Sequence, residues 1–210
     1  ALEELGHEVQ IVNVASGVEI LKQINSFRPD FVHVQYDDFV ELCPYIQYPN
    51  AITSHFGYLE QPRKWDYYGP RVAQKFANIK PNVFCLSPGI KDVYEKIMEI
   101  PSNQLFVTPN GVNVDKFKYN KLQLESDICK SLYLAKIDYR KRQHMFQSID
   151  SLWYAGNNAD PRFDVNKNYL GEWSKETLYN DLTKYGNLVL LSDGEAHPLV
   201  CLEAFAAGLG

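Results

Sequence analysis

The chain has 210 residues, a length that suits one large domain or two small ones. Its composition is that of a globular protein, with 45% apolar and 22% charged residues, 12 Gly and 11 Pro, which excludes collagen, coiled coil and extended disorder. The 21 basic and 26 acidic residues give a net charge of −5, which disfavours nucleic acid as the main partner.

The sequence carries no sign of membrane insertion or secretion. No apolar run approaches about 18 residues, and the first four residues lack the basic region of a signal peptide. None of the four cysteines belongs to a CxxC motif and most lie in apolar runs, which favours reduced core thiols. We therefore expect a cytoplasmic protein without a transmembrane segment, while peripheral contact with a membrane stays open.

Strands alternate with helices along the first half of the chain. The opening residues predict the tail of a helix that ends at Gly6. Strands are predicted at 9–14, 31–35, 50–56, 82–87 and 104–109, and helices at 17–26 and 88–99. This alternation is typical of right-handed crossovers and of a parallel sheet covered on both faces.

A second series of strands and helices follows a polar stretch. The ten residues after Phe117, KYNKLQLESD, mark the boundary, so the predicted domains are residues 1–118 and 128–210. In the second domain, strands are predicted at 131–137, 151–156, 168–171 and 187–192, and helices at 175–185 and 198–207. The prediction is therefore two doubly wound α/β domains that face a cleft, with ligands at the carboxyl ends of the strands.

The last predicted helix begins with features of an anion site. Pro198 suits the first helical position, where its missing N–H group is not needed. The N–H groups of Leu199 and Val200 are then expected to be free donors at the positive end of the helix dipole.

Two glutamates flank this helix start. Glu195 lies just before the helix and Glu203 lies in its second turn, and carboxylates accept hydrogen bonds from vicinal hydroxyls, which suggests sugar on both sides of a phosphate. The alternative is that Glu203 is a solvated residue of a surface helix. Against this alternative, its neighbours are apolar, and a carboxylate in apolar surroundings usually has a partner. These neighbours are Leu199, Val200, Leu202, Phe205 and Ala206.

Residues 192–208 resemble the Glu-x7-Glu motif of the retaining glycosyltransferases of family 4 (glycosyl transferases group 1). This family has the GT-B fold, in which two Rossmann-like domains face a cleft. The resemblance implies that Glu195 binds hydroxyls of the transferred sugar and that Glu203 holds the ribose hydroxyls of the nucleotide.

The segment YLAKIDYRKRQ resembles the strand end with which the family grips phosphate. Lys136 stands where the family commonly has Arg, and Lys141 matches a later Lys. Two cations there would stabilise the charge that grows on a leaving nucleoside diphosphate. The pattern departs from the family at Ala135, which replaces the usual Gly, and a Lys lacks the planar fork of Arg. The alternative is a solvated basic turn.

Two segments of the first half also resemble the family. TPNGVNVDKF is similar to the motif that leads into the second domain, and its Asn110 and Gly111 suit a turn with positive φ that shapes the cleft wall. The segment Thr53–His55 resembles the family's Thr-x-His, whose His approaches the donor sugar. The alternative for His55 is a structural hydrogen bond.

Other cofactor and nucleotide motifs are absent from the sequence. The remaining histidines show no metal spacing and no Asp-x-Asp pair is present, so metal-independent chemistry without a cofactor is expected. GxGxxG, GxxxxGK[ST] and GxSxG do not occur, which disfavours dinucleotide enzymes, P-loop enzymes and α/β-hydrolases.

These observations predict a retaining hexosyltransferase. It would transfer a sugar from a UDP or GDP sugar to the hydroxyl of a carbohydrate or other acceptor, and the resemblance implies attack from the front face. The family has further elements before and after the matched segments, so the chain is expected to be a fragment truncated at both ends. Two alternatives stay open: a catalytically inert homologue that binds nucleotide sugars, or another GT-B enzyme such as an epimerase or a phosphorylase.

Overall fold

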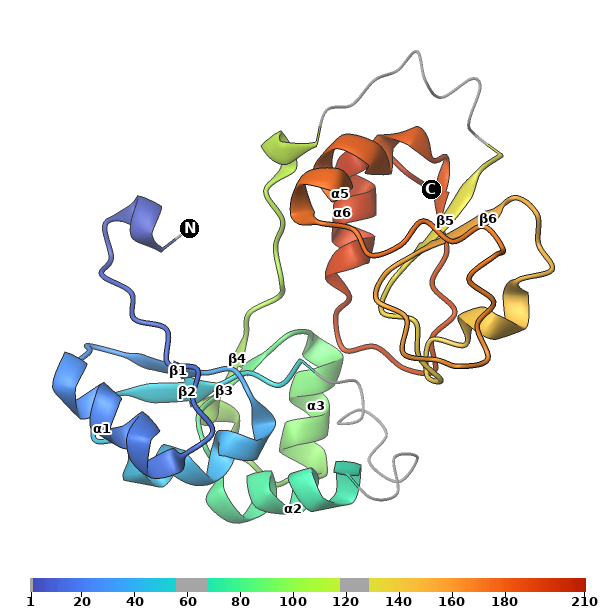
Figure 1. The fold of residues 1–210 in the computed structure, drawn as a ribbon. Coiled ribbons are helices and arrows are strands. Elements are labelled where there is room, and N and C mark those ends of the chain that lie inside the picture. The colour runs from blue at the N-terminus through green and yellow to red at the C-terminus, as the bar shows by residue number, and fades with distance from the viewer. Residues whose placement is uncertain (1, 56–67, 118–128) are drawn as a thin grey trace. The chain divides into compact units, whose positions relative to one another are not determined.

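The computed structural model describes residues 2–55, 68–117 and 129–210 (Figure 1). The chain divides into two compact units, Ala1–Pro109 and Asn110–Gly210. Residues 110–117, which the sequence placed in the first domain, belong to the second unit, where the Phe117 ring packs edge-on against that of Tyr179. The predicted linker at 118–127 lies outside the described residues.

The first unit contains a parallel sheet of four described strands in the order β1-β2-β3-β4. The strands are β1 (Val32–Val34), β2 (Asn50–Ile52), β3 (Val83–Cys85) and β4 (Leu105–Val107). The helices are α1 (Gly17–Phe27), α2 (Tyr68–Ile79) and α3 (Pro88–Lys96), with 3₁₀ turns η1 (Glu3–Leu5), η2 (Asp37–Tyr45) and η4 (Ser102–Gln104). Each of these strands lies within a predicted strand.

Serine caps explain where two of the predicted helices begin. The Ser16 side chain accepts a hydrogen bond from the Glu19 N–H at the start of α1, and Ser87 accepts one from Ile90 at the start of α3. Pro88 occupies the first turn of α3, as predicted. Helix α1 ends at Arg28, whose left-handed backbone (φ 57°) precedes Pro29.

The predicted strand at 9–14 is wrong. These residues form no regular element, and Ile11 is 86% exposed. An alternating apolar pattern forms a strand only when a neighbouring strand takes up its backbone hydrogen bonds. None of the described strands pairs with this segment, since the only neighbour of β1 in the described sheet is β2.

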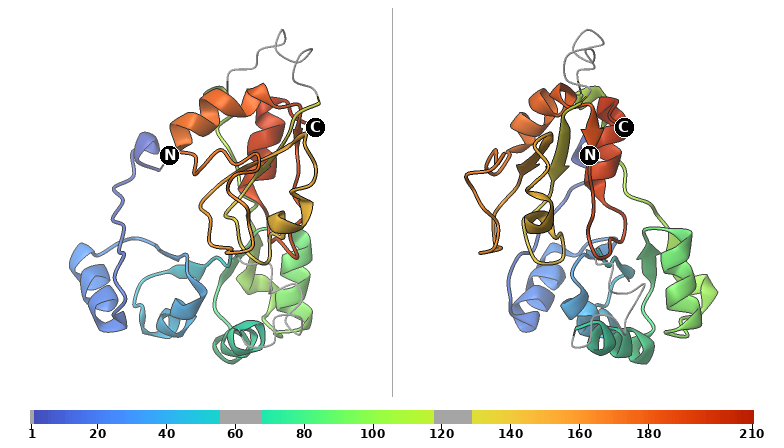
Figure 2. Two further views of the ribbon diagram at one scale, coloured as in Figure 1. Left: turned by 45° about the vertical axis from the view of Figure 1, so that its right-hand side comes forward. Right: turned by 90° about the vertical axis from the view of Figure 1, so that its right-hand side faces the viewer.

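The second unit contains a smaller parallel sheet, in the order β6-β5-β7. Its strands are β5 (Ser131–Leu134), β6 (Leu152–Ala155) and β7 (Asn187–Leu188). The helices are α5 (Lys175–Asp181) and α6 (Leu199–Ala207), with 3₁₀ turns η5 (Val114–Lys116), η7 (Gln143–Phe146) and η8 (Leu182–Lys184). Helix α6 packs against η5, β7 and η8 (Figure 1; Figure 2).

Two predicted strands of this unit are shorter than expected. The segment at 168–171 makes a single bridge, between Tyr169 and Tyr154. The strand at 187–192 is reduced to the two residues of β7, and at Leu191 side chains take the place of strand partners. The Leu191 carbonyl accepts from the Arg142 guanidinium, and the Leu191 N–H donates to the Tyr133 hydroxyl.

The second sheet is covered on both faces and has a switch point. One buried cluster includes Leu132, Leu178, Leu182 and Ala204, and the other includes Tyr133, Tyr154 and Phe163. Strand β5 lies between β6 and β7, so the strand order reverses at β5. In open α/β sheets, ligands bind outside the carboxyl ends of the strands at such a reversal. Within the described ranges, no helix is both long and apolar enough to cross a membrane.

Candidate functional site

Two loops meet at the switch point of the second sheet. Residues 135–142 follow β5, and residues 189–198 follow β7. The Asp193 N–H donates to the Arg140 carbonyl at 2.8 Å, and the Arg142 Nε donates to the Leu191 carbonyl at 2.9 Å. The two loops therefore form one hydrogen-bonded surface at the carboxyl ends of β5 and β7.

Tyr133, a residue of β5, connects these two loops through its hydroxyl. It is fully buried, and its hydroxyl donates to the Lys141 carbonyl at 2.6 Å while it accepts from the Leu191 N–H at 3.0 Å. Burial raises the pKa of Tyr133 to about 12, so the hydroxyl stays protonated at neutral pH. Sequence analysis missed this residue because a tyrosine in an apolar strand looks like an ordinary core residue.

The loop after β5 is held in one conformation by local hydrogen bonds. Asp138 Oδ1 accepts from the backbone N–H groups of Arg140 and Lys141, both at 3.0 Å. The buried Gln143 donates to the Lys136 carbonyl at 3.0 Å, and Arg142 adopts the left-handed conformation (φ 56°). These hydrogen bonds fix the backbone of the loop that carries Lys136 and Lys141.

Lys141 and Glu195 come together at the junction of the two loops. Lys141 Nζ is in direct contact with Glu195 Oε1, and the two side chains are only 11% and 23% exposed. Burial raises the pKa of the nearby Cys201 thiol, the Glu195 carboxylate raises it further, and Lys141 opposes the rise. Lys136 lies at the end of β5 with an exposed side chain. Two of the residues that the resemblance implied for catalysis therefore form one ion pair.

Helix α6 begins one residue later than predicted. Pro198 is the N-cap and Leu199 the first helical residue, and proline offers no side-chain cap. The first N–H donated within this turn belongs to Cys201, which binds the Pro198 carbonyl at 3.2 Å. The N–H groups of Leu199 and Val200 precede it, where a helix start has donors without intrahelical acceptors. This end of α6 follows the loop that carries Glu195.

Asn110 and Gly111 do not form the predicted turn with positive φ, because neither has a positive φ angle. Asn110 instead fixes the loop in front of α6. Its N–H donates to His197 Nδ1 at 3.2 Å, and its side-chain amide donates to the His197 carbonyl at 2.9 Å. Since His197 lies between Glu195 and the start of α6, Asn110 positions the segment that carries these groups.

Glu203 is buried, as its apolar neighbours predicted, and it has a charged partner. Its side chain is 9% exposed, and Lys175 Nζ lies 2.6 Å from its Oε1. The sequence did not reveal Lys175, which lies 28 residues away on α5. Both residues line a cavity of about 170 Å³. The other lining residues are Gly111, Val112, Asn113, Phe117, Tyr179 and Leu199.

His55 belongs to the first unit, where it follows β2 and is exposed. The preceding residues are anchored: Ser54 donates to Asp37 at 3.1 Å, and Thr53 Oγ1 lies 2.7 Å from His33 Nε2. Partial burial lowers the pKa of His55, so its ring is neutral at neutral pH. The pKa of His33 is lowered by burial and, to a smaller extent, by His55.

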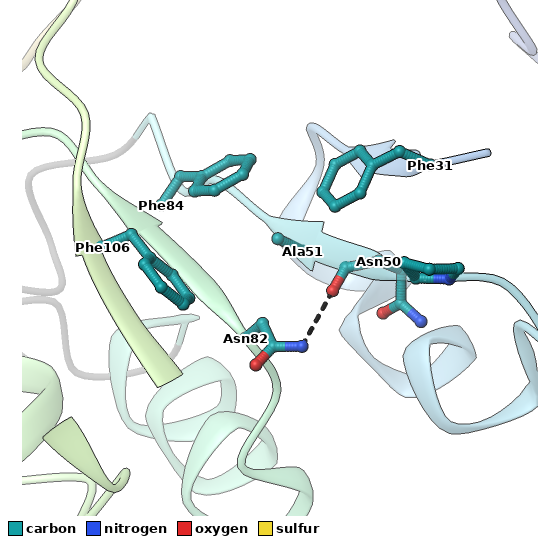
Figure 3. Close-up of a pocket in the computed structure, with 7 residues that line it drawn as sticks. Phe31, Asn50, Ala51, Asn82, Phe84 and Phe106 are labelled. Atoms are coloured by element: carbon teal, nitrogen blue, oxygen red, sulfur yellow. Dashed lines mark hydrogen bonds between the residues drawn. The ribbon is translucent and has the colours of Figure 1, made fainter. Parts of the chain in front are cut away.

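A second cavity, of about 230 Å³, lies in the first unit (Figure 3). Its wall includes Phe31, Phe84 and Phe106, and Asn82 donates to the Asn50 carbonyl. Asn50 opens β2, and Phe31 and Asn82 immediately precede β1 and β3. The cavity is therefore at the amino ends of the strands, away from the end where α/β sheets bind ligands. Metal-binding clusters of three or more His, Cys, Asp or Glu side chains are not found in the described parts of either unit.

Comparison with known proteins identifies the family. The model of glycosyltransferase family 4 matches residues 12–116, which is half of the chain. The chain belongs to glycosyltransferase family 4. No curated protein sequence matches it.

Solved structures extend the likeness to the second unit and show the GT-B fold. HepE from Anabaena, crystallised with UDP and glucose, superposes with a TM-score of 0.69 at 11% identity, over 92% of this chain and 60% of that one. Sucrose-phosphate synthase from Thermosynechococcus elongatus gives 0.67 at 16% identity, over 92% of this chain and 58% of that one. This family 4 chain thus spans about 60% of the length of these structures.

Proposed function

We propose that the protein is a retaining glycosyltransferase that moves a sugar from a nucleoside-diphosphate sugar to an acceptor hydroxyl without a bound metal ion. The observation that carries this proposal is the Lys141–Glu195 pair at the switch point of the second sheet. Membership of family 4 supports it, and so does the likeness to HepE, which was crystallised with UDP and glucose.

In this proposal the anionic part of the donor lies at the positive groups of the second unit. Lys141, Lys136 and the N–H groups of Leu199 and Val200 bind the diphosphate and stabilise the charge that grows on it. Glu195, held against Lys141, accepts hydrogen bonds from hydroxyls of the transferred sugar. Glu203, in the cavity beside α6, accepts hydrogen bonds from the ribose.

The chemistry then needs little from the protein beyond positioning and electrostatics. The bond between the anomeric carbon and the phosphate oxygen breaks, and the acceptor oxygen forms its bond on the same face. The acceptor proton passes to the departing phosphate. For His55 the Thr-x-His resemblance implies a hydrogen bond to the donor sugar, and the lowered pKa of His55 favours the neutral ring that such a bond uses.

Calorimetry beside a turnover assay tests this proposal on the full-length protein. Titration with a panel of UDP and GDP sugars identifies the donor, and the assay follows release of the nucleoside diphosphate in the presence of candidate acceptors. We expect binding and transfer with one donor. Binding without transfer would instead support an inert sugar-nucleotide-binding homologue, and an epimer or a sugar phosphate as product would support a different GT-B enzyme.

A further inference from the structure

The wall of the cavity beside Glu203 includes a positively charged side chain to which the family motif gives no role. Lys175, the first residue of α5, places its ammonium 2.6 Å from the buried carboxylate of Glu203. The two partners differ in exposure, since the Lys175 side chain is 67% exposed and that of Glu203 is 9% exposed. The carboxylate is thus fixed within the protein wall, while the ammonium reaches it from solvent.

Each partner keeps hydrogen-bonding capacity for a ligand. An ammonium has three N–H donors and a carboxylate can accept about four hydrogen bonds. Lys175 binds only Oε1, and no other side chain in the described ranges binds the Glu203 carboxylate. The cavity wall therefore presents a charged donor and a charged acceptor side by side.

A sugar hydroxyl matches such a pair because it donates one hydrogen bond and accepts others at the same oxygen. We propose that Lys175 and Glu203 together bind the ribose hydroxyls of the nucleoside diphosphate, with Lys175 as a specificity residue that rejects deoxyribose. Each hydroxyl donates to Glu203 and accepts from Lys175. This inference rests on the proposed function and assigns a second residue to the ribose subsite.

The size of the cavity supports a ribose subsite. At about 170 Å³ it is smaller than the pockets of about 300 to 1,000 Å³ that enclose drug-sized ligands, so it suits one part of a nucleotide. Its remaining walls are Gly111, Val112 and Asn113 of the chain before η5, and the rings of Phe117 and Tyr179. Lys175 and Glu203 are the charged residues of this lining.

Substitution of Lys175 combined with removal of ligand hydroxyls tests the proposal. Full-length wild type, Lys175→Met and Lys175→Arg are titrated by calorimetry with UDP, 2′-deoxy-UDP and 3′-deoxy-UDP, and with the GDP series if GDP is the better ligand. We expect wild type to prefer the ribose form by roughly tenfold or more, as for a site built to bind a hydroxyl. Lys175→Met loses most of this preference because binding of UDP weakens, and Lys175→Arg keeps most of it.

Lys184→Met is the matched control. Lys184 Nζ lies 2.6 Å from Asp181 Oδ1, which equals the distance from Lys175 Nζ to Glu203 Oε1, but Lys184 is not part of the cavity lining. We expect this control to behave as wild type. The ratio of the affinities for UDP and for a deoxy-UDP, measured on one sample, does not depend on the folded fraction of that sample. If Lys175→Met does not fold, Lys175→Gln is used in its place.

Three outcomes would overturn the inference. If Lys175→Met prefers the ribose ligand over the deoxyribose ligands as strongly as wild type does, the ion pair is only a surface contact. If Lys175→Met binds UDP more tightly than wild type does, Lys175 competes with the ligand for Glu203. Either result leaves the proposed function intact. Failure of wild type to bind any nucleoside diphosphate would overturn the inference and the proposed function together.

Discussion

Lys141 and Glu195 are in direct contact where the loops after β5 and β7 meet, and both side chains are largely buried. Asp138 and Tyr133 form hydrogen bonds with the backbone of Lys141 and hold it in place. The ammonium that contacts Glu195 therefore extends from a fixed backbone position. A cation held in place before the reaction stabilises developing negative charge without reorganisation. We infer that Lys141 acts mainly on the departing diphosphate.

Replacement of Lys141 should therefore reduce turnover more than donor binding. For Lys141→Ala we expect kcat to fall by roughly 100-fold or more, with a smaller change in donor KM. Steady-state kinetics of the full-length protein measure both constants, and Lys136→Ala is assayed in parallel. Lys167→Ala, on an exposed loop of the same unit, is the control. Equal kinetics of Lys141→Ala and this control would contradict the role.

The two glutamates should separate in their effects. Glu203→Gln should weaken binding of the free nucleoside diphosphate, since the ribose loses a charge-assisted hydrogen bond that is worth about 1.5 to 3 kcal/mol. Glu195→Gln should mainly reduce kcat, because in the proposed function Glu195 binds the reacting sugar. Calorimetry with UDP or GDP, beside kinetics, distinguishes the two. A similar loss of nucleotide affinity in both variants would refute the assignment.

Asp160 makes the second unit sensitive to acid. Two hydrogen bonds from the Arg162 guanidinium, at 2.8 Å each, and one from the Arg162 N–H, at 3.1 Å, hold the pKa of this buried carboxylate at about 2, and His144 adds to the effect. A carboxylate with a lowered pKa stabilises the fold above its ordinary pKa near 3.8 and loses this contribution as the pH falls toward 2.

We expect Asp160→Asn to be less stable than wild type at neutral pH, with a difference that shrinks between about pH 4 and pH 2. Urea unfolding at a series of pH values measures this. Asp150→Asn, at an exposed position, is the control and should show no such pH dependence. A constant difference from wild type across the pH range would show that the Asp160 charge does not stabilise the fold.

At the scale of elements, the loops after β5 and β7 are held together because the Tyr133 hydroxyl forms hydrogen bonds with both of them. Tyr133→Phe removes the shared hydroxyl and leaves the Lys141 carbonyl and the Leu191 N–H without it. We expect kcat to fall by about tenfold, with donor KM nearly unchanged, because Lys141 is less well positioned, and stability to fall by about 1 to 3 kcal/mol.

Tyr154→Phe is a matched control for this prediction. Tyr154 is the strand partner of Tyr133 and equally buried, but its hydroxyl has no hydrogen-bond partner among the described residues. Removal of that hydroxyl should leave kcat as in wild type. If the two variants lose activity to the same extent, the link between the loops does not position Lys141.

The sequence revealed the elements whose contacts are local or strongly apolar. Helix α1 was predicted from its end before Pro29 and α3 from its start at Pro88, and β5 and β6 were predicted from apolar runs that include the buried Leu132 and Tyr154. Helix α2 was missed, although Val72 and Phe76 have helical spacing and are buried, because no capping pattern drew attention to it. The prediction of a strand at 9–14 was wrong because a strand forms only by pairing with another strand, and that partner is distant in the sequence.

The candidate site was only partly visible in the sequence. Motif positions led to Glu195 and Lys141 at the switch point of the second sheet and to Glu203 on α6. Lys175 and Tyr133 were missed, since long-range partners leave no local pattern. Asn110 was chosen for a turn, but it acts through hydrogen bonds to His197, 87 residues away.

At the scale of the whole molecule, we propose that the protein's own cations replace a metal ion. The decisive measurement is NMR of the transfer product that the full-length enzyme forms in EDTA. We predict transfer at an undiminished rate and a product with the anomeric configuration of the donor. An inverted product, or transfer that requires added Mg²⁺ or Mn²⁺, would contradict the account.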